Sequence, residues 1–179
     1  PAETPTVFFS IDPQIHKTKQ GTPYFMESGV SLIAQTVSNL EPIRTFLSDF
    51  DGLDFAQYLD DPTPLYYGDQ LTKFAGQVCY MSMNENRTKN IDADKYFENI
   101  KAQNHGSIME HSGYTFLIYG VDRSFTHELV RHRIASYSQI SQRYVDDTVL
   151  RYVGRSLVAR FPDLQQAWED IIDNNREQY

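Results

Sequence analysis

The alternation of apolar and polar positions along the chain predicts several strands. Short apolar alternation marks residues 29–37, and a longer run of alternating aromatic and aliphatic residues marks 112–121. Both have the two-residue period of a strand, and the second is expected to have at least one well-buried face. A further extended piece is expected over 148–153.

Apolar residues at helical spacing predict a helix from Asp69 to about Met83, with Asp69 as its cap. Cys79 falls on the apolar stripe of this helix and is therefore predicted to be a buried core residue. A polar loop over 84–90 follows, and the next helix is expected over 92–104, starting at one of its aspartates.

Two more helices are predicted in the second half of the chain. One is expected over 125–136, with Asp122 or Ser124 as its cap. The last begins at Pro162, because proline lacks a backbone N–H and is well suited to the first turn of a helix. Together the patterns predict an α+β fold in which a central, mostly antiparallel sheet is flanked by helices.

Two stretches lack such periodicity. Residues 1–27 contain four prolines and little pattern, so we expect an irregular N-terminal arm or extension, with 28–179 forming a single domain. Residues 39–68 contain three prolines and many aspartates, and are expected to be a surface excursion with a short helix around 43–50. The absence of an initiator methionine suggests that the chain is processed or incomplete.

Composition narrows the class of protein. The chain has 179 residues, of which 40% are hydrophobic, with no apolar run near the roughly 18 residues of a membrane span and no signal peptide. These features predict a cytoplasmic protein without a membrane partner. The formal net charge of −8 argues against a general nucleic-acid binder. Cys79 is the single cysteine, so an internal disulfide is excluded.

Positive charge is concentrated in one window of the sequence. Seven of the ten arginines lie in 123–160, which contains no lysine and only three carboxylates. The window therefore has a net charge of +4 and the remainder −12. Arginine provides planar, permanently charged, bidentate donors, so this window predicts an anion site.

Common catalytic and metal motifs do not account for this window. His127-Glu128 begins a zinc-protease pattern, but position 131 is arginine and His132 lies about 140° from His127 around a helix, so no metal site is expected. The chain has neither the G-x-S-x-G turn of serine hydrolases nor a phosphate-binding P-loop or dinucleotide motif. Arginine side chains, hydroxyls and backbone amides remain as phosphate binders.

The arginine window centres on 131–144, which reads RHRIASYSQISQRY. On a continuous helix, Glu128 shares a face with Arg131, whereas Arg131 and Arg133 lie about 200° apart and address opposite sides. One short segment could then contact two ligands, or one ligand and a neighbouring subunit. The alternative is that Glu128 and Arg131 form only a solvated ion pair.

These residues carry a family resemblance. Arg131-His132-Arg133 is followed by seven residues, then Ser141, with Arg143 two positions further, and 105–111 reads HGSIMEH upstream. The pattern resembles the flavin-dependent thymidylate synthases, whose signature is RHR, seven residues and S-x-R, preceded by an H-x-x-x-x-E-H block. Residues 71–146 match in order and spacing.

The resemblance implies an enzyme that converts dUMP to dTMP, with methylenetetrahydrofolate as carbon donor, NADPH as reductant and tightly bound FAD as cofactor. It further implies a homotetramer with sites at subunit interfaces, so that each chain is one domain of an oligomer. Ser141 and Arg143 take the catalytic positions, where they can polarise the uracil ring. The positions implied for FAD are Ser107, Arg131, His132, Arg133 and Gln139; those implied for dUMP are Glu128, Arg131, Gln139, Ile140, Ser141, Gln142 and Arg143.

The match also predicts differences from the family. Ser138-Gln139 stands where many members have asparagine and glutamate, and Glu128 where some have glutamine, which we expect to tune the site. Family chains continue beyond the helix at Pro162, so 28–179 is expected to lack the C-terminal part. Two alternatives therefore stay open: a noncatalytic flavin- or nucleotide-binding relic or truncated homologue, and RNA binding through the arginines and tyrosines of 123–160.

Overall fold

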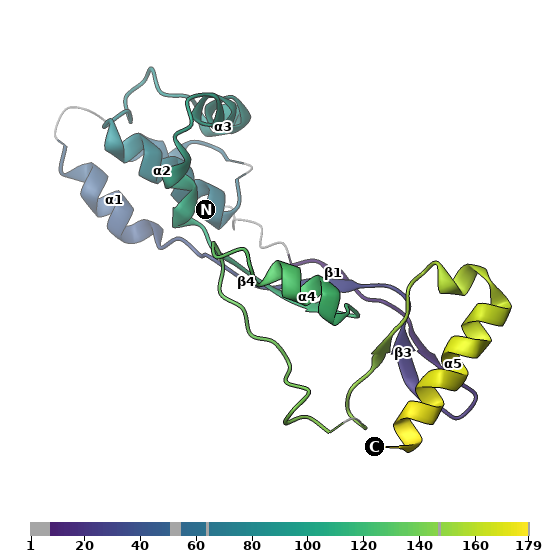
Figure 1. Ribbon diagram of the computed structural model, residues 1–179. Helices are drawn as coiled ribbons and strands as arrows, with labels where there is room; N and C mark the ends of the chain where they lie inside the picture. Colours follow the sequence, from purple (N-terminus) through teal and green to yellow (C-terminus); the bar gives the residue numbers. More distant parts are fainter. Residues whose placement is uncertain (1–7, 51–54, 64, 147, 179) are drawn as a thin grey trace. The chain divides into compact units, whose positions relative to one another are not determined.

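The computed structural model describes residues 8–50, 55–63, 65–146 and 148–178. The chain divides into two compact units (Figure 1). The first unit is built on Leu32–Thr115, and the second on Phe9–Ser31 together with Phe116–Tyr179. Each unit has its own cluster of buried apolar side chains.

The first unit is mainly helical. Its elements are α1 (Leu40–Ser48), the 3₁₀ helix η1 (Phe55–Asp60), α2 (Tyr67–Cys79), the 3₁₀ helix η2 (Asn90–Asp92), α3 (Ala93–Ala102) and the 3₁₀ helix η3 (Gly106–His111). Leu47, Phe55, Tyr58 and Met83 form its buried core. The prediction that 39–68 is a surface excursion is therefore wrong, because three of these four side chains come from that segment and burying them stabilises the unit.

The helix predicted from Asp69 is present as α2, but its details differ. It begins at Tyr67, and Tyr66 makes no side-chain cap bond, so Asp69 lies inside the first turn and is not the cap. The side chains buried by α2 are Thr72, Lys73 and Gln77, whereas Cys79 is exposed. The prediction of a buried Cys79 is wrong because the packed face of α2 carries polar residues that an apolar stripe does not reveal.

In the second unit, β2 (Ile15–Lys17) and β3 (Pro23–Phe25) form an antiparallel hairpin. Gly21, at φ +89°, provides the left-handed turn residue between them. β6 (Tyr152–Val153) pairs parallel to β3, which confirms part of the extended piece predicted over 148–153. The prediction that 1–27 is irregular is wrong for its described part, which contains paired strands. Such short strands pair without the long apolar alternation that the sequence analysis looked for.

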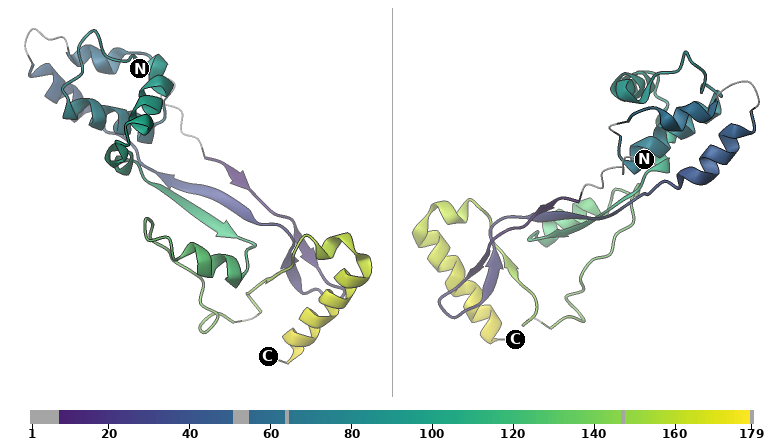
Figure 2. Two further views of the ribbon diagram at one scale, coloured as in Figure 1. Left: turned by 45° about the horizontal axis from the view of Figure 1, so that its top comes forward. Right: turned by 180° about the vertical axis from the view of Figure 1, so that it is seen from behind.

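The last predicted helix is confirmed as α5 (Pro162–Glu177), with proline in its first turn. It lies beside the β2-β3-β6 sheet in both views of Figure 2. Tyr24, Met26 and Ile172 form the buried cluster between them, joined by Trp168 edge-on to Tyr24 at 5.1 Å. The Tyr24 hydroxyl donates to Glu169 Oε1 over 2.6 Å.

The second sheet has the order β1-β4-β5, formed by β1 (Ser10–Ile11), β4 (Gly29–Gln35) and β5 (Tyr114–Tyr119). β1 pairs antiparallel with β4, and the Thr36 N–H donates to the Gly113 carbonyl at the end of β4 and the start of β5. Both predicted strands are confirmed. The predicted buried face of β5 is not found, because five of its six residues are exposed and the sixth is half-buried.

The described residues thus form a mixed α and β protein with small, mostly antiparallel sheets and several helices, as predicted in outline. The strands are shared between two three-stranded sheets. No helix in the described ranges is long and apolar enough to span a membrane.

Candidate arginine-rich active site

The short helix α4 (Arg123–Leu129) introduces the candidate site in the second unit. The Asp122 carboxylate accepts the Phe125 N–H over 2.9 Å, which confirms Asp122 as the N-cap. At the other end, the Val130 N–H donates to the Thr126 carbonyl, and the chain then leaves the helix in a turn. Residues 131–144, the arginine-rich stretch, therefore begin in the exposed turn that follows α4.

The prediction of a helix over 125–136 is wrong in its second half, because α4 ends at Leu129. Ile134 is 98% exposed, so no apolar contact rewards a further helical turn. The helical angle between Arg131 and Arg133 consequently does not apply. Arg131 and Arg133 are therefore not held on opposite faces of a helix, and both side chains are exposed.

Two side chains of α4 hold the middle of the stretch. Gln139 Nε2 donates to Thr126 Oγ1 over 2.7 Å. The Arg123 guanidinium donates to the Ile140 carbonyl over 2.8 Å and to Gln142 Oε1 over 3.1 Å. The structure thus brings three of the predicted substrate-contacting positions together beside α4. From the sequence, Arg123 contributes only to the charge of the arginine window, and this positioning role was not predicted. Its position directly after the helix cap Asp122 was the one available signal.

Glu128 and Arg131 form an ion pair whose closest N–O distance is 3.8 Å. Their side chains are 75% and 74% exposed, so this contact contributes little to stability. Arg131 also donates from Nε to the His127 carbonyl over 3.3 Å. The predicted solvated pair is therefore present, and it leaves most of the guanidinium donors of Arg131 facing water.

The remaining arginines of the stretch have few partners. Among the residues described, the side chains of His132 and Arg133 make no hydrogen bond or ion pair, while the His132 carbonyl accepts from the Tyr137 hydroxyl over 2.9 Å. The Arg143 guanidinium lies 6.0 Å from the centre of the Tyr144 ring. Ser141 Oγ accepts the backbone N–H of Arg143 over 3.2 Å, so a local turn bond joins the two predicted catalytic residues.

Ser107 belongs to the first unit, where it lies exposed on η3 within the HGSIMEH block. The other predicted positions, from Glu128 to Arg143, belong to the second unit and are exposed or half-exposed. The structure therefore groups every predicted site residue except Ser107 on α4 and the stretch that follows it.

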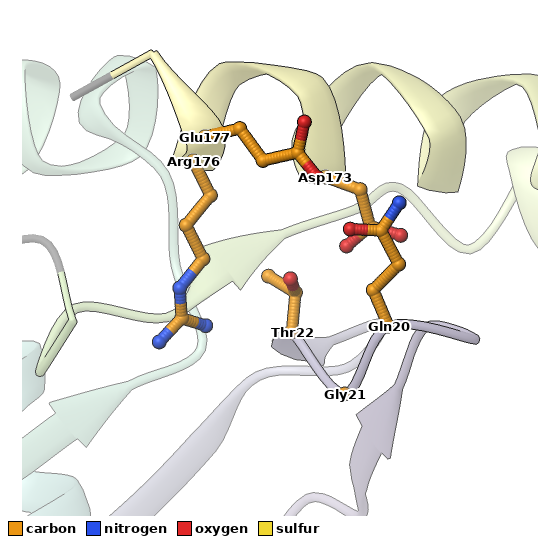
Figure 3. A pocket seen from close by; sticks show the side chains of 6 residues that line it. All are labelled: Gln20, Gly21, Thr22, Asp173, Arg176 and Glu177. Atoms are coloured by element: carbon orange, nitrogen blue, oxygen red, sulfur yellow. The ribbon is translucent and has the colours of Figure 1, made fainter.

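The described residues of the second unit line two hollows of similar volume. One, of about 350 Å³, is lined on one side by α4, through Asp122 and Phe125, and otherwise mainly by apolar residues including Ile118, Val121 and Val153. The other, of about 340 Å³, lies where the β2-β3 turn meets the end of α5, and Figure 3 shows Arg176, Glu177 and Asp173 facing Gln20, Gly21 and Thr22. The sequence patterns indicated neither hollow.

No metal site is formed by the part of the chain that the structure describes, in which no group of three or more histidine, cysteine, aspartate or glutamate side chains is placed to hold an ion. The donors gathered at the candidate site are arginine, glutamine and serine side chains. These groups bind phosphate and carbonyl oxygens by charge-assisted and neutral hydrogen bonds.

Fold and site together define a mixed α and β protein in which an exposed arginine-rich stretch follows a short capped helix. A family model described as "Thymidylate synthase complementing protein" matches residues 65–179, which is more than half of the chain and includes this stretch. The chain belongs to that family.

Curated relatives in the family have a common name. The chain is 36% identical over 150 residues to the flavin-dependent thymidylate synthase of Mycobacterium avium (strain 104). It is 34% identical over 150 residues to the protein of that name from Mycobacterium marinum (strain ATCC BAA-535 / M). Each match covers 84% of this chain and 54% of the relative, so the chain spans about half the length of the relatives it matches.

Proposed function

We propose that the chain is a flavin-dependent thymidylate synthase that makes dTMP from dUMP in the cytoplasm. Methylenetetrahydrofolate would provide the carbon and NADPH the reducing equivalents. The observation that supports this proposal most strongly is the continuous series Arg131-His132-Arg133, Ser141 and Arg143, inside the matched region 65–179. The names of the relatives support the reaction.

The donor chemistry of the stretch suits FAD and dUMP. Both molecules carry phosphate, and arginine provides forked donors that match phosphate oxygens. Arg133 has no carboxylate partner among the described residues, and Arg131 has only the solvated contact with Glu128. The guanidinium groups are therefore available to an anion, and a phosphate can bind without first displacing a strong ion pair.

We assign FAD binding to Ser107, Arg131, His132, Arg133 and Gln139. When bound, the flavin supplies the redox chemistry of the reaction. The two arginines would hold its negative charge, and Gln139 would be held in place by its bond to Thr126. Because Ser107 belongs to the first unit, its assignment rests on the family resemblance of the HGSIMEH block.

We assign dUMP binding to positions around the contact between Ser141 and Arg143. The Arg143 guanidinium and the Ser141 hydroxyl would donate to uracil oxygens and withdraw electron density from the ring. The exposed Cys79 belongs to the other unit and has no part in this scheme. The substrate-binding set is Glu128, Arg131, Gln139, Ile140, Ser141, Gln142 and Arg143.

We further propose that the chain works as a homotetramer with sites at subunit interfaces. In such an assembly the β1-β4-β5 sheet would be the central sheet of each domain, flanked by helices. Support comes from β5, where Phe116, Leu117 and Ile118 are 39% to 52% exposed in the single chain. Exposed apolar side chains at adjacent positions favour burial against a partner.

The proposal is tested on the purified protein supplied with FAD. We expect a flavin absorption spectrum that remains after gel filtration, and NADPH oxidation that requires dUMP. A flavin spectrum without dUMP-dependent oxidation would support the noncatalytic flavin-binding alternative. Salt-sensitive RNA affinity in place of both signals would support the RNA-binding alternative.

A further inference from the structure

Lys73 is a fully buried cation in the helical first unit, at 0% exposure on the packed face of α2. Its ammonium donates three hydrogen bonds: to Asn90 Oδ1 over 2.8 Å, to the Thr88 carbonyl over 2.9 Å and to Gln77 Oε1 over 3.2 Å. All three ammonium donors are therefore used. Two of the acceptors belong to the segment that joins α2 to α3.

Two aromatic rings and a buried ion pair surround Lys73 and the segment that it contacts. The Lys73 ammonium lies 5.2 Å and 5.5 Å from the ring centres of Tyr58 on η1 and Tyr96 on α3. Asp61 accepts the Asn90 N–H over 2.8 Å and lies 3.6 Å from the Arg87 guanidinium, with both side chains of that ion pair at least nine-tenths buried. Residues 84–90 are thus attached to the unit by buried polar contacts rather than by an apolar core.

We propose that the Lys73 amino group fastens residues 84–90 against α2 as a strap, and that the strap opens by exposing Lys73 to water. Near Lys73 the strap is held by hydrogen bonds and not by apolar packing, so no other contact replaces the bonds that Lys73 makes. Opening therefore requires the Lys73 amino group to leave its acceptors and the two rings. This device is independent of the reaction proposed for the second unit.

Proton linkage gives the strap a specific pH dependence. Burial lowers the pKa of Lys73 from 10.5 to about 8 in the closed strap, whereas an exposed lysine keeps its ordinary value. Between these values Lys73 is a neutral amine in the closed form, where its two N–H groups still donate to the strap, and an ammonium in the open form, so opening takes up a proton. A rise in pH through this window therefore disfavours opening.

The other charged and titratable groups facing Lys73 limit the useful pH range. Burial raises the pKa values of Tyr58 and Tyr96 above the usual 10, so above that pH opening would release protons from them and the pH dependence would reverse. The clean window therefore runs from pH 8 to about pH 9.5. The groups around Lys73 and its two rings are Asp61, Arg87, Cys79 and Tyr80.

Pulsed hydrogen exchange on the wild-type protein tests the strap directly. We expect the opening constant of the amides in 84–90, corrected for intrinsic exchange, to fall about tenfold from pH 8 to pH 9.5. Amides of α5, which does not contact Lys73, serve as the internal reference. An opening constant for 84–90 that stays flat or rises over this range would overturn the proposal.

Matched variants separate the ammonium from general packing. Lys73→Met should raise the opening constant of 84–90 about tenfold at pH 7.5, because buried acceptors lose their donor, and should abolish the pH dependence. Lys73→Arg should also lose the pH dependence, since arginine does not titrate in this range. Lys95→Met, at a lysine whose side chain is 76% exposed, should change neither. If Lys73→Met keeps the wild-type opening constant, the proposal is wrong; if it does not fold, the wild-type series decides.

Discussion

At the scale of single residues, Arg143 and Ser141 define the expected chemistry of the site. The backbone N–H of Arg143 donates to Ser141 Oγ over 3.2 Å, a local bond within the short segment that carries both side chains. A guanidinium provides several donors to one ligand, whereas a serine hydroxyl provides one. We therefore expect Arg143 to dominate dUMP affinity and Ser141 to matter more for turnover.

Arg143→Ala tests the affinity half of this assignment. Loss of a charge-assisted hydrogen bond costs about 1.5 to 3 kcal/mol, so the Kd for dUMP should rise roughly tenfold to a hundredfold. Titration calorimetry with dUMP measures it. Arg160→Ala is the control, because Arg160 is also exposed but lies on η4 (Val158–Arg160), outside the site. Equal affinity in wild type and Arg143→Ala would show that the assignment of Arg143 is wrong.

Ser141→Ala tests the turnover half. Removal of a donor aimed at developing charge lowers kcat by about 100-fold in comparable sites, while the bound flavin should stay near the wild-type amount. Steady-state dTMP formation and the flavin-to-protein absorbance ratio provide the two readouts. Ser156→Ala, at an exposed serine outside the site, should change neither. Flavin loss equal to the activity loss would instead indicate a structural role for Ser141.

At the scale of elements, the link between α4 and the arginine-rich stretch depends on Arg123. Arg123→Ala should raise the KM for dUMP about fivefold with little change in kcat, because Ile140 and Gln142 lose a positioning partner over 2.8 and 3.1 Å. Arg123→Lys should recover part of the loss. Arg155→Ala is the control, since the contact of Arg155 within the described residues is an exposed one of 4.0 Å with Asp122. An unchanged KM in Arg123→Ala would show that Arg123 does not position Ile140 and Gln142 for dUMP.

The turn from β5 into α4 depends on Gly120. Its φ of +66° favours glycine, and an added Cβ would lie 2.5 Å from the Glu27 carbonyl. Gly120→Ala should therefore lower the free energy of unfolding by about 2 kcal/mol. Urea denaturation followed by circular dichroism measures the change. Gly106→Ala, where a Cβ meets no atom within 4 Å, should shift stability far less, and similar losses in both variants would contradict this explanation.

At the scale of the whole molecule, local patterns predicted the elements whose signals are short-range. β4, α5 with its first-turn proline and the Asp122 cap all depend on residues close together in the sequence. The candidate site was recognisable for the same reason, because Arg131 to Arg143 are contiguous. Contacts such as Arg123 to Ile140 were not predictable, since they depend on how the chain turns after α4.

Other features depend on long-range packing and were missed. Cys79 matched an apolar stripe, yet α2 buries Lys73 and Gln77, whose side chains bond to each other and also to Asn90 and Ser82. The helix expected through Ser136 ended at Leu129 because nothing in the described chain packs on Ile134. The strands within 10–25 were missed because each is only two or three residues long.

The central claim is that the chain makes thymidylate at the arginine-rich stretch. The most direct measurement is dTMP, detected by mass spectrometry after the purified protein is incubated with dUMP, methylenetetrahydrofolate, NADPH and FAD. We predict dTMP in the complete mixture, none when dUMP, methylenetetrahydrofolate or NADPH is omitted, and a large loss in Ser141→Ala. No dTMP above the protein-free background from a flavin-loaded preparation would contradict the claim.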